Sequence, residues 1–307
     1  MKIIVTGVCG LVGRRLASHL LDQGHQIFGI GRSQCENMDS RLLSDYVLMD
    51  LSSKNAVEKL KKVIPTGIDI IIHCAAQQPR SGLLFKDYRE GNVDTTENIV
   101  EWAKSANVQT MISFSTIAFL DLPLEDGVAI TESAKAAPQN YYALSKWVSE
   151  SYLRLLGNNS NFTVLCFRIP SLVHEEQQGG VVYTYWNSAL QNTDLDIYDN
   201  GQFRRNLIYI DSILEVVDIV LTKLDSYKEF NLYNIGSKDS WTLFEVAKYI
   251  YKRIDSSAKI FPVDKSSAIH GHWNVNISKA KEELDFTPWS TQEILDAYIQ
   301  NMCGDGE

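Results

Sequence analysis

Two side chains spaced four residues apart could carry out proton transfer. Tyr142 and Lys146 stand in the run YYALSK at residues 141–146, and this spacing places both side chains on one face of a helix. A phenol with a pKa of about 10 is a poor base until a neighbouring cation stabilises the phenolate. The Lys146 ammonium would supply that cation, so that Tyr142 could exchange a proton with a substrate hydroxyl or carbonyl.

The context of this pair supports a catalytic interpretation. A lone Tyr-x-x-x-Lys pattern also arises by chance, so it is weak by itself. Ser115, however, closes a buried strand expected at residues 110–115, and its hydroxyl would hydrogen-bond the same substrate oxygen as Tyr142. We therefore predict that hydride transfer takes place beside these groups.

Three glycines predict a dinucleotide cofactor for that hydride. Gly7, Gly10 and Gly13 follow a buried strand at residues 2–6 and open a helix. In this context glycines let the backbone turn tightly and approach a pyrophosphate, while the helix N-terminus offers amides to its charge. The spacing is GxxGxxG, and the strand before it and the helix after it favour the cofactor over a simple turn.

The end of the second strand bears on which dinucleotide binds. Many such folds place a carboxylate there to accept hydrogen bonds from the ribose hydroxyls, whereas this chain reads Gly31-Arg32-Ser33. Without a repelling carboxylate, a 2′-phosphate could pair with the Arg32 guanidinium. We therefore expect NADP, with NAD as the alternative. Asp50 and Leu51, after the third strand, are expected beside the adenine.

The hydrophobic pattern predicts the elements that position these groups. Short apolar runs alternate with amphipathic segments of helical length, as expected for a parallel sheet covered on both faces. The fold class is α/β, a Rossmann-type doubly wound sheet with a smaller C-terminal substrate-binding subdomain. We expect residues 1–168, rejoined by about 206–236, to form the dinucleotide-binding domain, and residues 169–205 and 237–307 the substrate subdomain. The predicted strands are residues 2–6, 26–30, 46–49, 68–73, 110–115, 163–168 and 206–210, and the predicted helices include one that begins near Val12 and stops at Gly24, 92–105, 142–155, 241–253 and 278–284.

Composition narrows the class of function. The 307 residues carry a formal charge of −9, which disfavours nucleic acid and anionic membranes as main partners. Apolar runs are too short to span a bilayer, and we expect a cytoplasmic protein. Five cysteines without CxxC spacing argue against a disulfide framework, so we expect mostly reduced thiols. His270 and His272 have no companion ligands, and no metal site is predicted.

Taken together, the motifs resemble the extended short-chain dehydrogenase/reductase family, in particular its NAD-dependent epimerase/dehydratase branch acting on nucleotide sugars. The resemblance covers nearly the whole chain. The matching segments are residues 6–13 (TGVCGLVG), 73–76 (HCAA), 92–93 (NV), 113–116 (SFST), 138–146, 201–206 (GQFRRN), 209–211 (YID), 234–236 (NIG) and 278–280 (SKA).

This resemblance implies roles for individual residues and a homodimer. Tyr142 and Lys146 would be the catalytic pair and Ser115 the hydroxyl partner, with Thr116 as the second candidate. Ser115, Ser171 and Arg205 would contact the nucleotide sugar, with Arg205 near its diphosphate. The expected cofactor contacts are Gly7, Gly10, Leu11, Val12, Gly13, Arg32, Ser33, Asp50, Leu51, Cys74, Ala75, Ala76, Asn92, Tyr142, Lys146 and Ile169.

Departures from the family pattern leave the exact reaction open. The 4,6-dehydratases carry Asp-Glu where this chain has Thr116-Ile117, so we do not expect dehydration. Ser171 also stands where the family carries Asn. A 4-ketoreductase and an epimerase both fit the remaining motifs. Two alternatives are an NADPH-dependent reductase of a non-nucleotide carbonyl and a catalytically silent cofactor-binding subunit.

Overall fold

The computed structural model describes residues 1–35, 39–265 and 271–304, which divide into two compact units. Unit 1 consists of Met1–Leu120, Ala136–Arg168 and Val220–Tyr233. Unit 2 consists of Asp121–Lys135, Ile169–Ile219 and Asn234–Glu307. Each unit is therefore assembled from three stretches of chain.

A seven-stranded sheet forms the centre of unit 1. Its strand order is β11-β6-β5-β4-β1-β2-β3, and the pairs β1–β2, β1–β4, β2–β3 and β4–β5 are parallel. From β1 the chain adds β2 and then β3 on one side, and it returns to place β4 on the other side of β1. The direction of strand addition therefore reverses next to β1, and α/β sheets bind their ligands at such a point. The strands are β1 (Lys2–Thr6), β2 (Gln26–Gly31), β3 (Tyr46–Leu48), β4 (Ile70–His73), β5 (Thr110–Thr116), β6 (Thr163–Ile169) and β11 (Phe230–Asn234).

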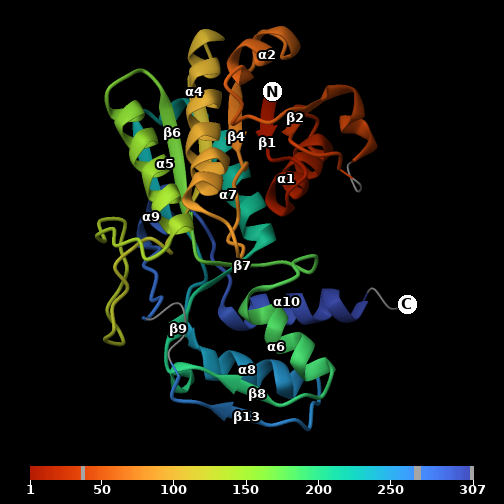
Figure 1. The fold of residues 1–307 in the computed structure, drawn as a ribbon, viewed down its shortest axis with the longest axis vertical. Coiled ribbons are helices and arrows are strands. Elements are labelled where there is room, and N and C mark those ends of the chain that lie inside the picture. The colour runs from red at the N-terminus through yellow and green to blue at the C-terminus, as the bar shows by residue number, and fades with distance from the viewer. Residues whose placement is uncertain (36–38, 266–270, 305–307) are drawn as a thin grey trace. The chain divides into compact units, whose positions relative to one another are not determined.

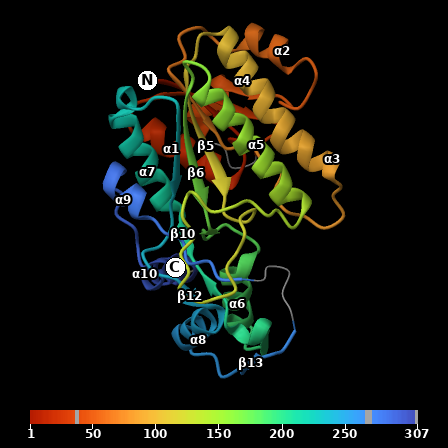
Figure 2. The same ribbon diagram turned by 90° about the vertical axis from the view of Figure 1, so that its left-hand side faces the viewer.

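Helices cover both faces of this sheet. Figure 2 shows α1 on one side of the strands and α2, α4 and α5 on the other, with α4 and α5 side by side (Figures 1 and 2). A short π-helical stretch, Arg89–Asp94, leads from α3 into α4. The helices of unit 1 are α1 (Leu11–Asp22), α2 (Ala56–Val63), α3 (Phe85–Tyr88), α4 (Thr95–Ser105) and α5 (Tyr141–Asn158), with 3₁₀ turns at Ser40–Asp45 and Leu224–Ser226.

Burial on both faces explains the unbroken apolar runs of the central strands. Ile3, Ile4 and Val5 have no exposed surface, and successive strand residues point to opposite faces. Ile4 packs in a cluster with Trp102 of α4 and Leu153 of α5. A polar residue in these strands therefore faces a helix on either side and needs a buried hydrogen-bond partner.

Local signals set the ends of the two helices that matter most for the site. Helix α1 ends just before Gly24, whose φ of +83° is the left-handed conformation that glycine adopts readily. Helix α5 begins after Asn140, whose side chain accepts a hydrogen bond from Ala143 N at 2.9 Å. Such a cap satisfies one of the amides that a helix start leaves unpaired.

Unit 2 consists of short strands and helices joined by irregular segments. Its two-stranded pairs are β10–β7 and β13–β8, both parallel, and β12–β9, which is antiparallel. Helix α8 starts with a capping box in which Thr242 and Glu245 bond each other's backbone amides. The elements are β7 (Ser171–Val173), α6 (Gly180–Leu190), β8 (Leu195–Ile197), a 3₁₀ turn (Asp199–Gly201), β9 (Arg204–Arg205), β10 (Leu207–Tyr209), α7 (Ile210–Thr222), β12 (Trp241–Thr242), α8 (Leu243–Arg253), β13 (Ile260–Pro262), α9 (Ser278–Leu284) and α10 (Thr291–Gly304).

The predicted fold class is confirmed, and most predicted elements are present within a few residues of their expected ends. The compact units differ from the expected domain boundaries at two places. Only Val220–Tyr233 rejoins unit 1, where residues 206–236 were expected, and Asp121–Lys135 belongs to unit 2. The latter segment is held there by backbone bonds from Ile130 N to Asn274 O and from Asn276 N to Ile130 O, at 2.7 and 2.9 Å. Helix α10 was not predicted.

Candidate functional site

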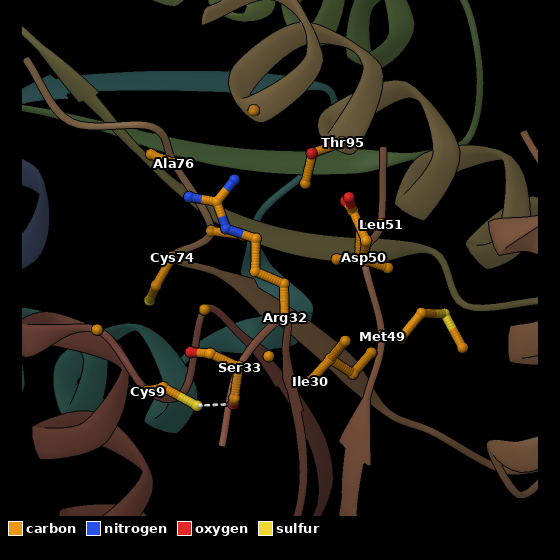
Figure 3. Close-up of a pocket in the computed structure, with 15 residues that line it drawn as sticks. Cys9, Ile30, Arg32, Ser33, Met49, Asp50, Leu51, Cys74, Ala76 and Thr95 are labelled. Carbon is orange, nitrogen blue, oxygen red and sulfur yellow. Dashed lines mark hydrogen bonds between the residues drawn. The ribbon is translucent and has the colours of Figure 1, made fainter. Parts of the chain in front are cut away.

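A pocket of about 270 Å³ opens at the carboxyl ends of the sheet strands in unit 1 (Figure 3). Its walls come from the loop after β1, the ends of β2 and β4, the segment after β3, and the start of α4. This is the edge at which doubly wound sheets bind ligands. The lining residues are Gly7, Cys9, Gly10, Ile30, Gly31, Arg32, Ser33, Met49, Asp50, Leu51, Cys74, Ala75, Ala76, Gly91 and Thr95.

Gly7, in the β1–α1 loop, and Gly13, in the first turn of α1, have no room for a side chain. Gly7 has a φ of +66°, and a Cβ on it would lie 2.6 Å from Ala75 N. A Cβ on Gly13 would lie 2.3 Å from Gly7 O. Any substitution would push the loop away from β4 or from α1. The loop therefore keeps a surface of bare backbone, which suits close contact with a pyrophosphate.

Arg32 directly follows β2, at the position where many dinucleotide-binding folds carry a carboxylate. Figure 3 shows the Arg32 side chain reaching across the pocket toward Ala76. Its Nη2 donates a hydrogen bond to Gln77 Oε1 at 2.9 Å. Asp50 lies on the opposite wall, where Oδ1 accepts bonds from the amide and hydroxyl of Ser52 at 2.9 and 2.8 Å.

The expectation that the cysteines are mostly reduced is wrong for one pair. Cys9 of the glycine loop and Cys35, after β2, form a disulfide with their Cα atoms 5.2 Å apart. The adjacent parallel strands β1 and β2 bring these two loops to the same sheet edge, a proximity that linear spacing does not reveal. Cys74, Cys166 and Cys303 are free.

A buried histidine ties the end of β4 to β1 and α4. His73 Nδ1 lies 2.7 Å from Thr6 Oγ1, and Nε2 lies 3.1 Å from Thr96 Oγ1. Thr6 Oγ1 also accepts a bond from Ala75 N at 3.2 Å. Burial, with a smaller effect from the charge of Lys146, lowers the pKa of His73 to about 3. His73 is therefore a neutral structural group behind the pocket.

Tyr142 and Lys146 lie one turn apart on α5, facing the end of β5. Lys146 Nζ donates to Phe114 O at 2.7 Å, and burial lowers the pKa of this lysine. Burial also raises the pKa of Tyr142 to about 12, while a hydrogen bond with Thr116 acts in the opposite direction. The ring of Tyr142 meets that of Tyr88 edge-on, with centroids 6.3 Å apart.

The hydroxyl of Ser115 is bound to a buried carboxylate. Ser115 Oγ donates to Glu150 Oε2 at 2.8 Å. Glu150 in turn pairs with Arg168, whose Nε and Nη2 reach Oε2 and Oε1 at 3.0 and 2.6 Å. Both charged side chains are at most 4% exposed. Ser115 is thereby turned toward the interior of unit 1.

Thr116 is placed differently from its neighbour. Its Oγ1 accepts a hydrogen bond from Ala118 N at 3.1 Å, and its side chain interacts with the Tyr142 phenol. A hydroxyl that accepts from an amide keeps its own proton for donation. Of the two hydroxyls, Thr116 is the one beside the candidate acid–base group.

A second cavity, of about 430 Å³, adjoins Tyr142 within unit 1. It lies between the segment after β4 and the start of α5. Polar and aromatic side chains line most of it. Its lining residues are Pro79, Arg80, Ser81, Leu83, Tyr88, Asn140, Tyr141 and Tyr142.

Asn92 connects the two halves of this edge. It lies in the π-helical stretch and is buried. Its Oδ1 accepts from Gln77 N, and its Nδ2 donates to Ser145 Oγ, both at 2.7 Å. Such π-helical turns are frequent at functional sites.

The structure places nine predicted cofactor residues in the wall of the first pocket. These are Gly7, Gly10, Arg32, Ser33, Asp50, Leu51, Cys74, Ala75 and Ala76. The predicted residues outside that wall are Leu11, Val12 and Gly13 in the first turn of α1, Asn92, Tyr142, Lys146, and Ile169 at the end of β6. Lining residues that we did not predict are Cys9, Ile30, Gly31, Met49, Gly91 and Thr95. Of these, Cys9 and Gly31 stand inside recognised motifs and could have been inferred.

The predicted substrate residues of unit 2 lie on short strands. Ser171 begins β7. Arg205, on β9, is buried, and its Nη1 donates to the carbonyls of Arg204 and Gly271, both at 2.9 Å. Its guanidinium stacks over Trp273, and burial lowers its pKa to about 10.

Two predicted absences concern metals and membranes. His272 is buried next to Arg204, while His270 lies outside the described residues. Within residues 1–35, 39–265 and 271–304, no three His, Cys, Asp or Glu side chains gather as a metal site would require. Over the same ranges, no helix has the length and apolar character needed to cross a bilayer.

Comparison with known proteins agrees with this geometry. The profile of the NAD dependent epimerase/dehydratase family matches residues 3–236, which confirms the resemblance inferred from the motifs. An uncharacterised UDP-glucose epimerase of Bacillus subtilis, YtcB, is 24% identical over 321 residues, covering 98% of this chain and 99% of the relative.

Solved structures share the fold over the whole chain. UDP-glucose 4-epimerase of Thermus thermophilus, in complex with NAD, superposes with a TM-score of 0.83 at 20% identity, covering 99% of each chain. The dTDP-glucose 4,6-dehydratase DesIV of Streptomyces venezuelae, with NAD bound, also gives 0.83 at 20% identity, covering 100% of this chain and 98% of that one.

Protonation of His73 should make the stability of the protein fall in mild acid. Its pKa is about 3 in the folded state against an ordinary 6.5, so between these values only the unfolded chain takes up this proton. The free energy of unfolding should therefore drop by up to about 1.4 kcal/mol per pH unit below pH 6.5 from this group. Urea unfolding of wild type and His73→Gln at several pH values would measure it. The variant should be less stable at pH 7 but show a shallower pH dependence, and equal slopes would contradict the assignment.

Proposed function

Because the chain belongs to the NAD dependent epimerase/dehydratase family, we propose that it is a nicotinamide-dependent oxidoreductase acting on a sugar carbon of a nucleotide sugar. The observation that carries the proposal is the placement of Tyr142 and Lys146 at the same sheet edge as the glycine-lined pocket. The two solved structures described above contain bound NAD. A silent binding subunit or a reductase of unrelated carbonyls is less well supported, because neither accounts for the family match.

Two features of the pocket suit the pyrophosphate of an adenine dinucleotide. Gly7 and Gly13 leave backbone where a Cβ would collide, and α1 begins directly behind this surface. Helix N-termini and bare amides favour the negative charge of a pyrophosphate. Arg32 and Ser33 would hold the ribose side of the adenosine, and Asp50 and Leu51 the adenine. When bound, the nicotinamide supplies or accepts the hydride.

The chain's own contribution to the reaction is proton transfer. Burial holds the Tyr142 phenol protonated at neutral pH, with a pKa of about 12. As a general acid it would give this proton to the substrate oxygen, and as a base it would need a nearby positive charge to form the phenolate. Lys146, one helical turn away, provides that charge.

We assign the hydroxyl partner of Tyr142 to Thr116 and a supporting role to Ser115. Thr116 interacts with the Tyr142 side chain, whereas Ser115 donates its proton to Glu150. A hydroxyl that has given its only proton to a carboxylate has no second one for a substrate oxygen. Thr116 would therefore stabilise the developing oxyanion.

Two reaction outcomes fit this site, and dehydration is not one of them. Elimination needs further acid–base groups, but the residue after Thr116 is Ile117, which is apolar and fully buried. The remaining outcomes are epimerisation and reduction of a 4-keto sugar. NADPH fluorescence separates them, because a reductase consumes the reduced cofactor with its substrate and an epimerase regenerates it.

The finer features of the proposal concern NADP and the substrate's diphosphate. Two residues support NADP. Arg32 could pair with the 2′-phosphate, and the last residue of β2 is Gly31, where many dinucleotide-binding folds carry a carboxylate that would repel this phosphate. For the diphosphate, we propose Arg205, because a buried cation stands out in a chain of net charge −9. Ser171 is proposed beside it.

A homodimer and a cytoplasmic location complete the proposal. Helix α5 exposes 40% of Trp147 and 65% of Leu155, and a second copy of the helix pair α4–α5 would cover these apolar side chains. Light scattering that returned the mass of one chain would contradict the dimer. The cytoplasmic location is proposed because nicotinamide-dependent reactions draw on an intracellular cofactor pool.

Replacing the phenol should separate catalysis from cofactor binding. Tyr142→Phe removes the transferred proton but changes no residue that lines the first pocket, where the dinucleotide is proposed to bind. We expect kcat to fall by about 10²–10⁴-fold, the usual contribution of a general acid–base group, with little change in dinucleotide affinity. Steady-state kinetics and NADPH titration would test this, and unchanged kcat would refute the mechanism.

The two hydroxyls can be told apart by isosteric changes. Thr116→Val should lower kcat by about 10²-fold or more, as loss of an oxyanion donor does. It should also lower the unfolding midpoint slightly, because Ala118 N loses its acceptor. Ser115→Ala should keep most of kcat and lower the free energy of unfolding by about 1 kcal/mol, because Glu150 loses a buried hydrogen bond. The opposite pattern of kcat values would return the catalytic role to Ser115.

Discrimination between cofactors should depend on Arg32. Arg32→Ala should weaken NADPH binding by roughly 10–100-fold, the equivalent of a charge-assisted hydrogen bond of about 1.5–3 kcal/mol, and leave NADH nearly unaffected. Arg32→Lys is the matched control, since it keeps the charge and should lose less. Equal losses for both cofactors would show that Arg32 does not contact the 2′-phosphate.

A further inference from the structure

We propose that Cys9 and Cys35 form a reversible thiol–disulfide site that controls access to the dinucleotide pocket: the disulfide narrows the adenosine end of the pocket, and the dithiol opens it. The inference rests on the proposed function only in that the ligand of this pocket is taken to be an adenine dinucleotide. It adds a redox-controlled modification site to that pocket.

The first support is the position of the pair. Cys9 lies inside the glycine loop, and its side chain forms part of the pocket wall (Figure 3). Cys35 follows shortly after Arg32 and Ser33, which line the same pocket. The disulfide holds the backbone at Cys35 within 5.2 Å of that at Cys9, measured between Cα atoms. The segment that carries Arg32 is thereby fastened to the glycine loop.

The second support is what the Cys9 sulfur touches. A Cβ placed on Gly31 would lie 2.7 Å from Cys9 Sγ and 2.8 Å from the Tyr46 hydroxyl. Gly31 is the last residue of β2, the point at which dinucleotide-binding folds receive the ribose hydroxyls of the adenosine. The sulfur therefore lies against the surface that the ribose needs.

The Cys9 sulfur has polar neighbours that suit both the disulfide and the thiol. Tyr46 donates a hydrogen bond to Ser33 O, and its hydroxyl lies 3.3 Å from Cys9 Sγ. Cys9 Sγ is 3.3 Å from Ser33 O, a distance at which the thiol form donates a hydrogen bond (Figure 3). After reduction, the Cys9 thiol at the pocket wall therefore still has a hydrogen-bond partner.

Reduction of the Cys9–Cys35 disulfide requires a dithiol as the reductant. A dithiol thiolate attacks one sulfur of the pair, the S–S bond breaks, and the other cysteine leaves as a thiolate that takes up a proton. The second thiol of the reductant then releases the mixed disulfide. Two electrons pass to the protein, both cysteines end as thiols, and the dithiol becomes a disulfide. Both cysteines are half-buried, so one sulfur is within reach of a reductant.

The other cysteines are poor candidates for this exchange. Burial raises the pKa of the Cys74 thiol to about 12 and also raises that of Cys166, which suppresses the reactive thiolate. Cys303 is exposed and free on α10 in unit 2. It serves as a matched control because it is reactive in principle but remote in sequence from every pocket residue.

Dinucleotide binding to the full chain in both redox states tests the proposal. The protein is oxidised with oxidised dithiothreitol or reduced with dithiothreitol, and NADPH and NADH are titrated by fluorescence. Alkylation and peptide mass spectrometry report the state of Cys9 and Cys35 in the same samples. We expect reduction to tighten binding by about tenfold or more, the equivalent of the ribose hydrogen bonds that the narrowed pocket denies the cofactor.

Variants assign the effect. Cys35→Ser, which changes no lining residue, should bind as the reduced protein does with or without dithiol, whereas Cys303→Ser should respond like wild type. Equal affinity in both states, tighter binding in the oxidised state, a retained response in Cys35→Ser, or thiols that stay alkylatable after oxidation would each overturn the inference. If no dinucleotide binds in either state, the proposed function itself fails.

Discussion

The position of helix α5, which carries Tyr142 and Lys146, depends on the buried pair of Glu150 and Arg168. Removing two charges from water costs several kcal/mol for each ion and is repaid only when every polar atom finds a partner. Here Glu150 Oε2 accepts from Ser115 and Arg168, and Oε1 accepts from Arg168 and, at 3.3 Å, from Arg154. The pair thus joins β5, α5 and β6. Because Glu150 lies one turn beyond Lys146, this junction also sets the rotation of α5 that points Lys146 and Tyr142 at the end of β5.

The same constraint explains why the two adjacent hydroxyls differ. The Glu150 carboxylate accepts the proton of the Ser115 hydroxyl. The Thr116 hydroxyl is therefore the one that remains for Tyr142. The sequence predicted the Tyr142–Lys146 pair because a helical spacing is a local property. It could not decide between Ser115 and Thr116, because that choice depends on residues 35 and 18 positions apart from their partners along the chain.

Elsewhere too, features that depend on local patterns were predictable from the sequence, whereas features that depend on distant contacts were not. Buried strands and the glycine turn were predicted from short patterns, and the carboxyl ends of the strands then had to share one edge. The Cys9–Cys35 bond, the Arg32–Gln77 contact and the transfer of residues 121–135 to unit 2 all depend on pairings across the fold. Helix α10 was missed for a different reason: its buried residues include Thr291 and Tyr298, so its apolar stripe is interrupted by polar groups and weakly periodic.

A chain of hydrogen bonds connects the cofactor pocket to the catalytic helix. Arg32 donates to the Gln77 side chain, and Gln77 N donates to Asn92 Oδ1. Asn92 Nδ2 donates to Ser145 Oγ, which itself donates to the carbonyl of Tyr142 at 2.8 Å. The strand β4, held by His73 between Thr6 and Thr96, fixes the segment through which this path runs.

Because every link but the first is sheltered from full solvent exposure, the path acts as a rigid spacer rather than as a set of mobile surface contacts. Precise placement of an acid–base group relative to a cofactor is worth several kcal/mol of the reaction barrier. Asn92 is suited to the centre of such a path because its amide can accept on one side and donate on the other. Its place in a π-helical turn turns this amide inward between Gln77 and Ser145. The distance between the β2 edge of the pocket and the start of α5 is thus set by side-chain amide geometry, independently of the ion pair that anchors the middle of the same helix.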